Sequence, residues 1–219
     1  MKNKIIIFLI ILTSCSSEKE NLIIEGEISG VKNSKIYLSS ADKEEILDSV
    51  NIINGKFTLK TYVDSTKEMS MILGDKNSEN KFDFISEPAH IFFKSSKDKF
   101  VFNGKIQNSK LYVDYRNLKN QINRFDEKDL EMLAEQIEIS VKGNPNKYDS
   151  INEQRLKLNQ RKILFIVNYA MSNKTSPLSA FISYKYRNSI SDDYLKKIFE
   201  NLSDDIKGSY YGAKLNPSL

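Results

Sequence analysis

The sequence VNIINGKFTL, residues 50–59, decides the architecture of the first half of the chain. On both sides of Asn54-Gly55, apolar side chains alternate with polar ones, the spacing that places every second side chain on one face of a β-sheet. Asparagine and glycine tolerate the positive φ angles of a type I′ turn, and this pair is the strongest short-range hairpin signal. The segment therefore predicts two antiparallel strands joined by a two-residue turn.

The same period of two extends in both directions from the hairpin, over residues 22–104. Glycine, proline and clusters of polar residues divide this region into short apolar runs with no helical spacing between them. Eight such runs at regular intervals are typical of an antiparallel sandwich or barrel. The predicted strands lie around residues 22–28, 36–38, 46–52, 57–63, 69–73, 82–86, 89–93 and 100–103.

Helical spacing begins after Gly104. A stripe of apolar residues at steps of three and four predicts a first helix that Asn108 or Ser109 caps. A second apolar run is displaced from this stripe, so we expect the helix to kink or break near Asp126. The first stripe consists of Leu111, Tyr115, Leu118, Ile122 and Phe125, and the displaced run of Leu130, Leu133, Ile137 and Val141.

The segment 105–203 is predicted to be helical throughout. Glycine and proline within 143–146 end the first pair of helices, a third helix covers about 148–171, and two short ones follow Ser176 and Ser191. Residues 204–219 form a C-terminal tail with no pattern long enough for a further element. The predicted fold class is α+β, an N-terminal antiparallel β-sandwich or barrel of about eight short strands followed by an all-helical segment.

The first residues of the chain predict secretion and attachment to a membrane. Lys2 and Lys4 precede a short apolar run at 5–12, the pattern of a secretory signal, which is too short to span a bilayer as a helix. The residues before Cys15 resemble the lipobox of bacterial lipoproteins. This resemblance implies a signal peptide at 1–14, acyl chains on Cys15, a tether at 15–21 and an outer-membrane location facing the periplasm or the cell surface.

Composition excludes several classes of function. The formal charge is +4, and without Lys2 and Lys4 the chain has 31 basic against 29 acidic side chains, well interspersed, which gives no case for nucleic acid. One histidine and one cysteine cannot make the four soft ligands of a structural zinc site. We therefore expect no metal, no cofactor and no disulfide.

Short motifs occur along the chain in a recognisable order: GEISG at 26–30, KIYL at 35–38, DSV at 48–50, NGKF at 54–57, EP at 87–88, FNG at 102–104, SPLSAF at 176–181 and SYYG at 209–212. In this order they resemble the domain of unknown function that precedes a thioredoxin-like (AhpC/TSA family) domain in lipoproteins of the Bacteroidota. In that family the catalytic Cys-x-x-Cys follows the last motif. We expect this chain to end before such a domain, so the resemblance implies no redox activity here.

Few residues are candidates for chemistry. His90 has no nucleophile and acid near it in sequence, Asp48 and Ser49 interrupt an apolar strand, and Glu87 precedes a proline at a loop. For each, a structural role is the stronger reading. Exposed tyrosines could stack on a sugar or a peptide, since their polar tips favour interfaces. The tyrosines considered are Tyr62, Tyr112, Tyr184, Tyr210 and Tyr211.

Three functional hypotheses remain open from the sequence. The first is a non-catalytic lipoprotein, anchored in the membrane through Cys15, that binds an envelope protein or a small ligand. The second is the recognition half of a thiol-disulfide system acting with a separate thioredoxin-like protein, and the third is a glycan-binding sandwich. If the C-terminal tail is uncovered, its apolar residues would form a docking patch, and otherwise they belong to the core. These residues are Ile206, Tyr210, Tyr211 and Leu215.

Overall fold

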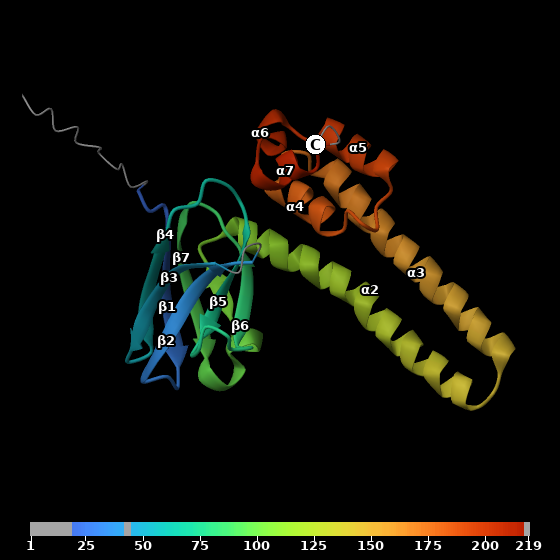
Figure 1. The fold of residues 1–219 in the computed structure, drawn as a ribbon, viewed down its shortest axis with the longest axis horizontal. Coiled ribbons are helices and arrows are strands. Elements are labelled where there is room, and N and C mark those ends of the chain that lie inside the picture. Colours follow the sequence, from blue (N-terminus) through green and yellow to red (C-terminus); the bar gives the residue numbers. More distant parts are fainter. Residues whose placement is uncertain (1–18, 42–44, 217–219) are drawn as a thin grey trace, which may run out of the picture.

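The computed structural model describes residues 19–41 and 45–216. The predicted signal peptide and Cys15 lie outside these residues. The first half forms a curled eight-stranded sheet, and the second half consists of helices, of which two make a long antiparallel hairpin that projects from the rest of the molecule (Figure 1). The predicted α+β fold is confirmed.

The sheet is mixed rather than wholly antiparallel. Its strand order is β6-β5-β2-β3-β4-β1-β7-β8. All neighbours pair antiparallel except β1 and β7, which run parallel with Ile24 opposite Ile91. Periodicity assigns each residue to a face but not to a neighbouring strand, so the parallel pair was not predictable. The strands are β1 (Leu22–Ser29), β2 (Asn33–Ser40), β3 (Ile46–Ile53), β4 (Lys56–Thr61), β5 (Glu68–Leu73), β6 (Lys81–Ile85), β7 (Ala89–Ser96) and β8 (Lys105–Gln107).

The predicted hairpin forms between β3 and β4. Asn54 and Gly55 both have positive φ, 52° and 80°, as the type I′ turn requires. Backbone pairing between these strands is confined to Ile53 opposite Lys56. Farther along, the Asp48 carboxylate accepts a hydrogen bond of 2.8 Å from the Lys60 backbone N–H, so a side chain joins the strands beyond the turn.

Aromatic rings fill the inside of the curled sheet. The ring of Phe93 lies 5.0 Å from that of Phe82 and 5.6 Å from that of Phe100. Gly26 leaves space for Phe57, whose ring atoms would lie only 1.9 Å from a Cβ at that position. Position 26 of β1 therefore has to be glycine, because the Phe57 ring occupies the space that a larger side chain would need.

The predicted strand at 100–103 is wrong. After a short 3₁₀ helix η1 (Lys97–Lys99), these residues form the helix α1 (Phe100–Asn103), and β8 follows it. Phe100 is buried whereas Phe102 is 90 % exposed, although both have the parity expected of one strand face. Two apolar residues two positions apart are too short a pattern to distinguish a strand from a single helical turn.

Six helices follow β8. They are α2 (Lys110–Val141), α3 (Pro145–Ser172), α4 (Pro177–Lys185), α5 (Asp192–Asn201), α6 (Asp204–Lys207) and α7 (Tyr210–Lys214). The Ser109 hydroxyl accepts a hydrogen bond from the Tyr112 N–H and caps α2, as predicted. Gly143, with a φ of 67°, lies in the turn between α2 and α3, where the sequence predicted the helix to end.

The predicted break near Asp126 is wrong, since α2 is continuous. Polar contacts join the α2–α3 hairpin along its length. Asp126 accepts from Lys162 at 2.9 Å, and Asp129 accepts two hydrogen bonds from Arg155, at 2.8 and 3.0 Å. Arg155 also donates to the Gln136 side chain. Beyond Asp126 the hairpin therefore has a mixed interior, in which these polar groups lie beside the buried Ile139 and Ile151.

The C-terminal tail, in which no element was predicted, contains two short helices. Residues 204–207 and 210–214 form α6 and α7, and the side chains of Ile206, Tyr211 and Leu215 are buried. Single helical turns carry too few residues to show a period. The tail is part of the core rather than an exposed docking patch.

The two halves meet at Glu68, the first residue of β5. Its carboxylate accepts a hydrogen bond of 2.7 Å from Lys185 on α4. Its backbone N–H donates to the Tyr211 hydroxyl on α7 at 3.1 Å. Two helices are thereby joined to one residue of the sheet.

Replacing Gly55 by alanine tests the hairpin turn. A Cβ there would face positive φ and would lie 2.9 Å from the Ile28 carbonyl oxygen. We expect the free energy of unfolding in urea to fall by about 2 kcal/mol or more. Gly143→Ala is the matched control, because φ is also positive but no atom lies within 4 Å of the added Cβ. It should lose only about 1 kcal/mol. Equal losses would contradict a packed turn.

Acid titration tests the polar interior of the hairpin. The Arg155 hydrogen bonds lower the pKa of Asp129 from its ordinary value. The pair therefore stabilises the fold above the unfolded-state pKa of about 3.9, and this contribution is lost as pH falls through the lower folded-state pKa.

Asp129→Asn should accordingly reduce stability at pH 7 by less than about 1 kcal/mol, because the carboxylate is partly exposed. The difference from the unmodified chain should vanish in strong acid. Glu138→Gln, in an exposed pair with Lys142, is the control and should change stability less. An Asp129→Asn effect independent of pH would mean that the charge is not what stabilises the hairpin.

Candidate functional site

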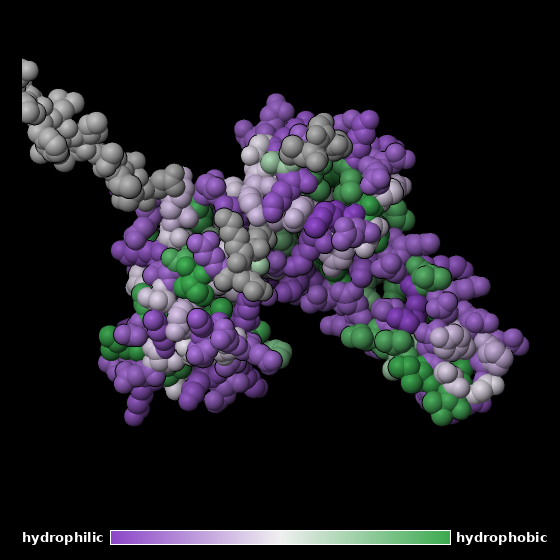
Figure 2. All heavy atoms as spheres, in the orientation of Figure 1, coloured by the Kyte–Doolittle hydropathy of each residue, from purple (hydrophilic) through white to green (hydrophobic). Residues whose placement is uncertain are grey.

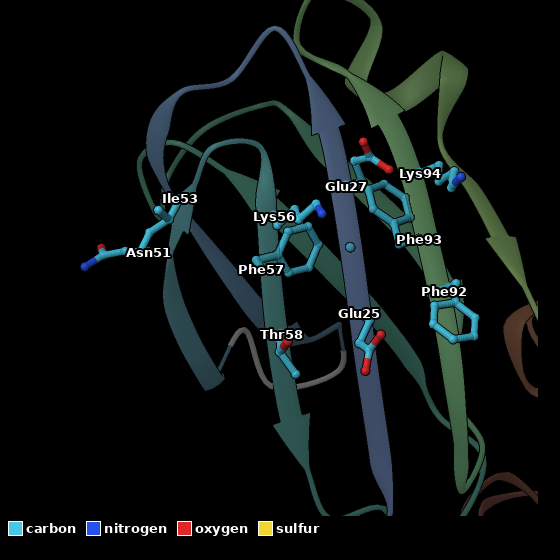
Figure 3. Close-up of a pocket in the computed structure, with 11 residues that line it drawn as sticks. Glu25, Glu27, Asn51, Ile53, Lys56, Phe57, Thr58, Phe92, Phe93 and Lys94 are labelled. Atoms are coloured by element: carbon cyan, nitrogen blue, oxygen red, sulfur yellow. The ribbon is translucent and has the colours of Figure 1, made fainter.

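A groove of about 530 Å³ lies on the outer face of the sheet. The backbone of Gly26 on β1 lies along its floor, above the buried rings of Phe57 and Phe93. Side chains of four strands surround it (Figure 3). They are Glu25 and Glu27 of β1, Asn51 and Ile53 of β3, Lys56 and Thr58 of β4, and Phe92 and Lys94 of β7.

Strand register sets the charge pattern of the groove. Glu27 lies opposite Lys56 on one neighbouring strand and Lys94 on the other. Charges of opposite sign in facing positions attract one another and keep the outer face of the sheet ordered. This end of the groove therefore has one carboxylate between two ammonium groups, a combination that can bind an anionic or a zwitterionic group.

The other end of the groove combines a carboxylate with aromatic rings. Glu25 lies opposite Thr58 and Phe92, and its carboxylate is 2.9 Å from His90 Nε2. The His90 ring lies 5.1 Å from that of Phe92. Both members of the pair are about half exposed, so their contact contributes little to stability. This end offers hydrogen-bond acceptors beside an apolar ring.

His90 is thus the one predicted candidate that the structure places beside the groove. Its partner is a single carboxylate, and the geometry is that of a surface pair. Within residues 19–41 and 45–216 no three histidine, cysteine or acidic side chains lie close enough together to hold a metal ion. The arrangement is suited to binding a ligand through charge, hydrogen bonds and one aromatic face.

The other candidates have structural roles. Asp48 bonds the Ser49 N–H at 2.7 Å as well as the Lys60 N–H, so it satisfies backbone groups where β3 and β4 separate. Glu87 accepts a hydrogen bond from the Ser109 hydroxyl and so fastens the start of α2 to the loop before β7. Neither carboxylate lies in the groove.

The candidate tyrosines do not form one surface. Tyr112 is buried, and burial raises its pKa, whereas Tyr62 is exposed. Tyr184 and Tyr210 pack on the buried Tyr211, with ring centres 5.4 and 5.0 Å from it. Tyr210 and Tyr211, the predicted binding residues, therefore belong to an aromatic cluster at the joint between the helices and the sheet.

The sequence analysis missed the residues that line the groove. Glu25, Glu27 and Phe92 occupy outward positions of predicted strands, and Lys56 and Lys94 directly adjoin two of these strands. The missing information was that β7 lies beside β1, which brings residues more than 60 positions apart onto one surface.

The fold and groove define a class of protein, an α+β protein with a groove on a curled sheet and a projecting helical hairpin. The family model described as a domain of unknown function, DUF4369, matches residues 22–157, and the chain belongs to this family. No curated protein and no solved structure matches the chain. In the part that the structure describes, no helix has the length and apolar character needed to cross a membrane.

Proposed function

We propose that this chain is an envelope lipoprotein that acts by binding, is anchored through acyl chains on Cys15, and takes a small envelope ligand in the groove on the outer face of the sheet. The groove is the observation that carries the proposal. It is large enough for a small ligand, and its lining combines charged, amide, hydroxyl and aromatic groups on rigid strands. Sites built on strands hold their side chains in fixed positions and so favour selective binding.

A glycan is the second candidate ligand. The half-buried ring of Phe92 beside the Glu25 carboxylate, with Asn51 and Thr58 across the groove, supports it. Sugars present apolar C–H faces to aromatic rings and hydroxyl groups to carboxylates and amides, so both chemistries have a counterpart here. The redox-accessory hypothesis has no such support from the groove and stays a prediction.

Binding to a carbohydrate array and to a panel of small anionic and zwitterionic envelope compounds tests the groove. For any ligand found, Phe92→Ala should weaken binding at least tenfold, because it removes the aromatic face. Glu25→Gln should also weaken binding if hydroxyl groups are recognised. Phe102→Ala is the control, since Phe102 is 90 % exposed on α1 and is not among the residues that line the groove. A ligand insensitive to Phe92→Ala would contradict the proposed site.

The anchor is tested by Cys15→Ala. Two or three acyl chains give stable membrane attachment where one is marginal. We expect the variant to remain unprocessed or to leave the membrane fraction, with the unmodified chain as the reference. Processed variant protein that still fractionates with membranes would contradict lipidation of Cys15.

A further inference from the structure

The distal half of the α2–α3 hairpin leaves large apolar side chains in water. Its interior holds the buried Ile139 and Ile151 together with Gln136, whose side-chain nitrogen is buried without a hydrogen-bond partner. The Asp129–Arg155 and Asp126–Lys162 pairs, which join the two helices, are partly exposed. On another face of α2, Leu130, Ile137 and Val141 are 64, 58 and 84 % exposed, and exposed apolar surface of this kind is costly in water.

The exposed residues form one continuous stripe. Leu130, Ala134, Ile137 and Val141 follow one another at steps of four, three and four, which places them on a single face of α2. From Leu130 to Val141 this face is about 16 Å long, the length of three helical turns. Figure 2 shows apolar surface gathered along the edge of the projecting hairpin. We call these four residues the outer stripe.

The outer stripe has an acidic border. At about 100° per residue, Glu127, Glu131 and Glu138 lie along the same side of it. Glu138 is paired with Lys142, whereas Glu127 and Glu131 make no ion pair with any residue that the structure describes. The stripe thus resembles one half of a coiled coil, an apolar seam with flanking charges that select the partner.

A second copy of this chain is not expected to bind the outer stripe. Two hairpins packed antiparallel through their stripes would bring acidic border against acidic border, with Glu131 close to Glu138 of the other copy. Like charges in flanking positions oppose pairing. A helix with basic flanking residues would instead pair with both unpartnered carboxylates.

We propose that the outer stripe is a docking site for an amphipathic helix of another protein, whose apolar face is bordered by lysine or arginine. Helix-in-groove and helix-on-helix recognition of this kind uses anchors at the spacing found here. The site is separate from the groove on the sheet, and its test uses no groove residue, so the two proposals fail or succeed independently.

The test measures fluorescence anisotropy of two synthetic peptides with the purified full chain. Both peptides are helical heptad sequences of about 21 residues with leucine on the apolar face, one with lysine and one with glutamate at the flanking positions. The lysine peptide should bind at least tenfold more tightly than the glutamate peptide. Binding should weaken as salt concentration rises, because exposed charges are screened.

Substitutions then locate the site. Ile137→Lys should weaken lysine-peptide binding at least tenfold, and Glu127→Lys with Glu131→Lys should reverse the preference toward the glutamate peptide. Val113→Lys is the matched control, an exposed apolar residue on the same helix about 25 Å from Leu130. All of these side chains are exposed, and circular dichroism confirms that each variant is folded.

Three results would overturn the proposal. The first is equal binding of both peptides, or binding of neither. The second is an affinity that Ile137→Lys leaves unchanged. The third is a dimer of the full chain in sedimentation that Ile137→Lys converts to a monomer, which would make a second copy the occupant.

Discussion

The structure depends on taking the Glu68 carboxylate out of water at the joint between the sheet and the helices. A partly buried carboxylate is stable only where donors replace its lost hydration. Lys185 supplies one from α4, and Tyr211 of α7 accepts a hydrogen bond from the backbone N–H of the same residue. Burial raises the pKa of Tyr115 on α2 well above its ordinary value, and the nearby charge of Glu68 adds to this effect, so the hydroxyl stays protonated. Contacts at Glu68 therefore help to hold the short C-terminal helices against the sheet.

Local chemistry was the predictable part of the fold. The Asn54-Gly55 turn, the Ser109 cap and the turn at Gly143 each depend on the conformational preference of one or two residues, and all three were correctly placed. Pairing over long distances was not predictable. The parallel contact of β1 with β7 depends on which strands share a core, and period-two spacing contains no information on that. Because the groove is built across this contact, its residues could be assigned to an outer face but not to one site.

The displaced apolar run on α2 shows how a correct pattern can lead to a wrong structure. Leu130, Ile137 and Val141 were assigned to a second helix because they leave the first stripe. They do lie on another face, but of the same helix, and the side that faces α3 holds the Asp129–Arg155 pair together with the buried Ile139. A change of phase can mark either a break in the backbone or a change in what surrounds the helix. Only the residues opposite, Arg155 and Lys162 of α3, distinguish the two.

The length of α2 has a mechanical consequence. The residues of α2 that are buried in the main core lie between Tyr112 and Ile122. The part beyond Ile122, about 28 Å long, projects from the core and packs against α3. A single helix of that length would bend, whereas two helices cross-linked by ion pairs resist bending as a beam does. A rotation of about 5° at the base would move the tip by about 2.5 Å, a displacement that follows from the helical rise alone. A small tilt at the base of the hairpin is therefore enlarged at its tip.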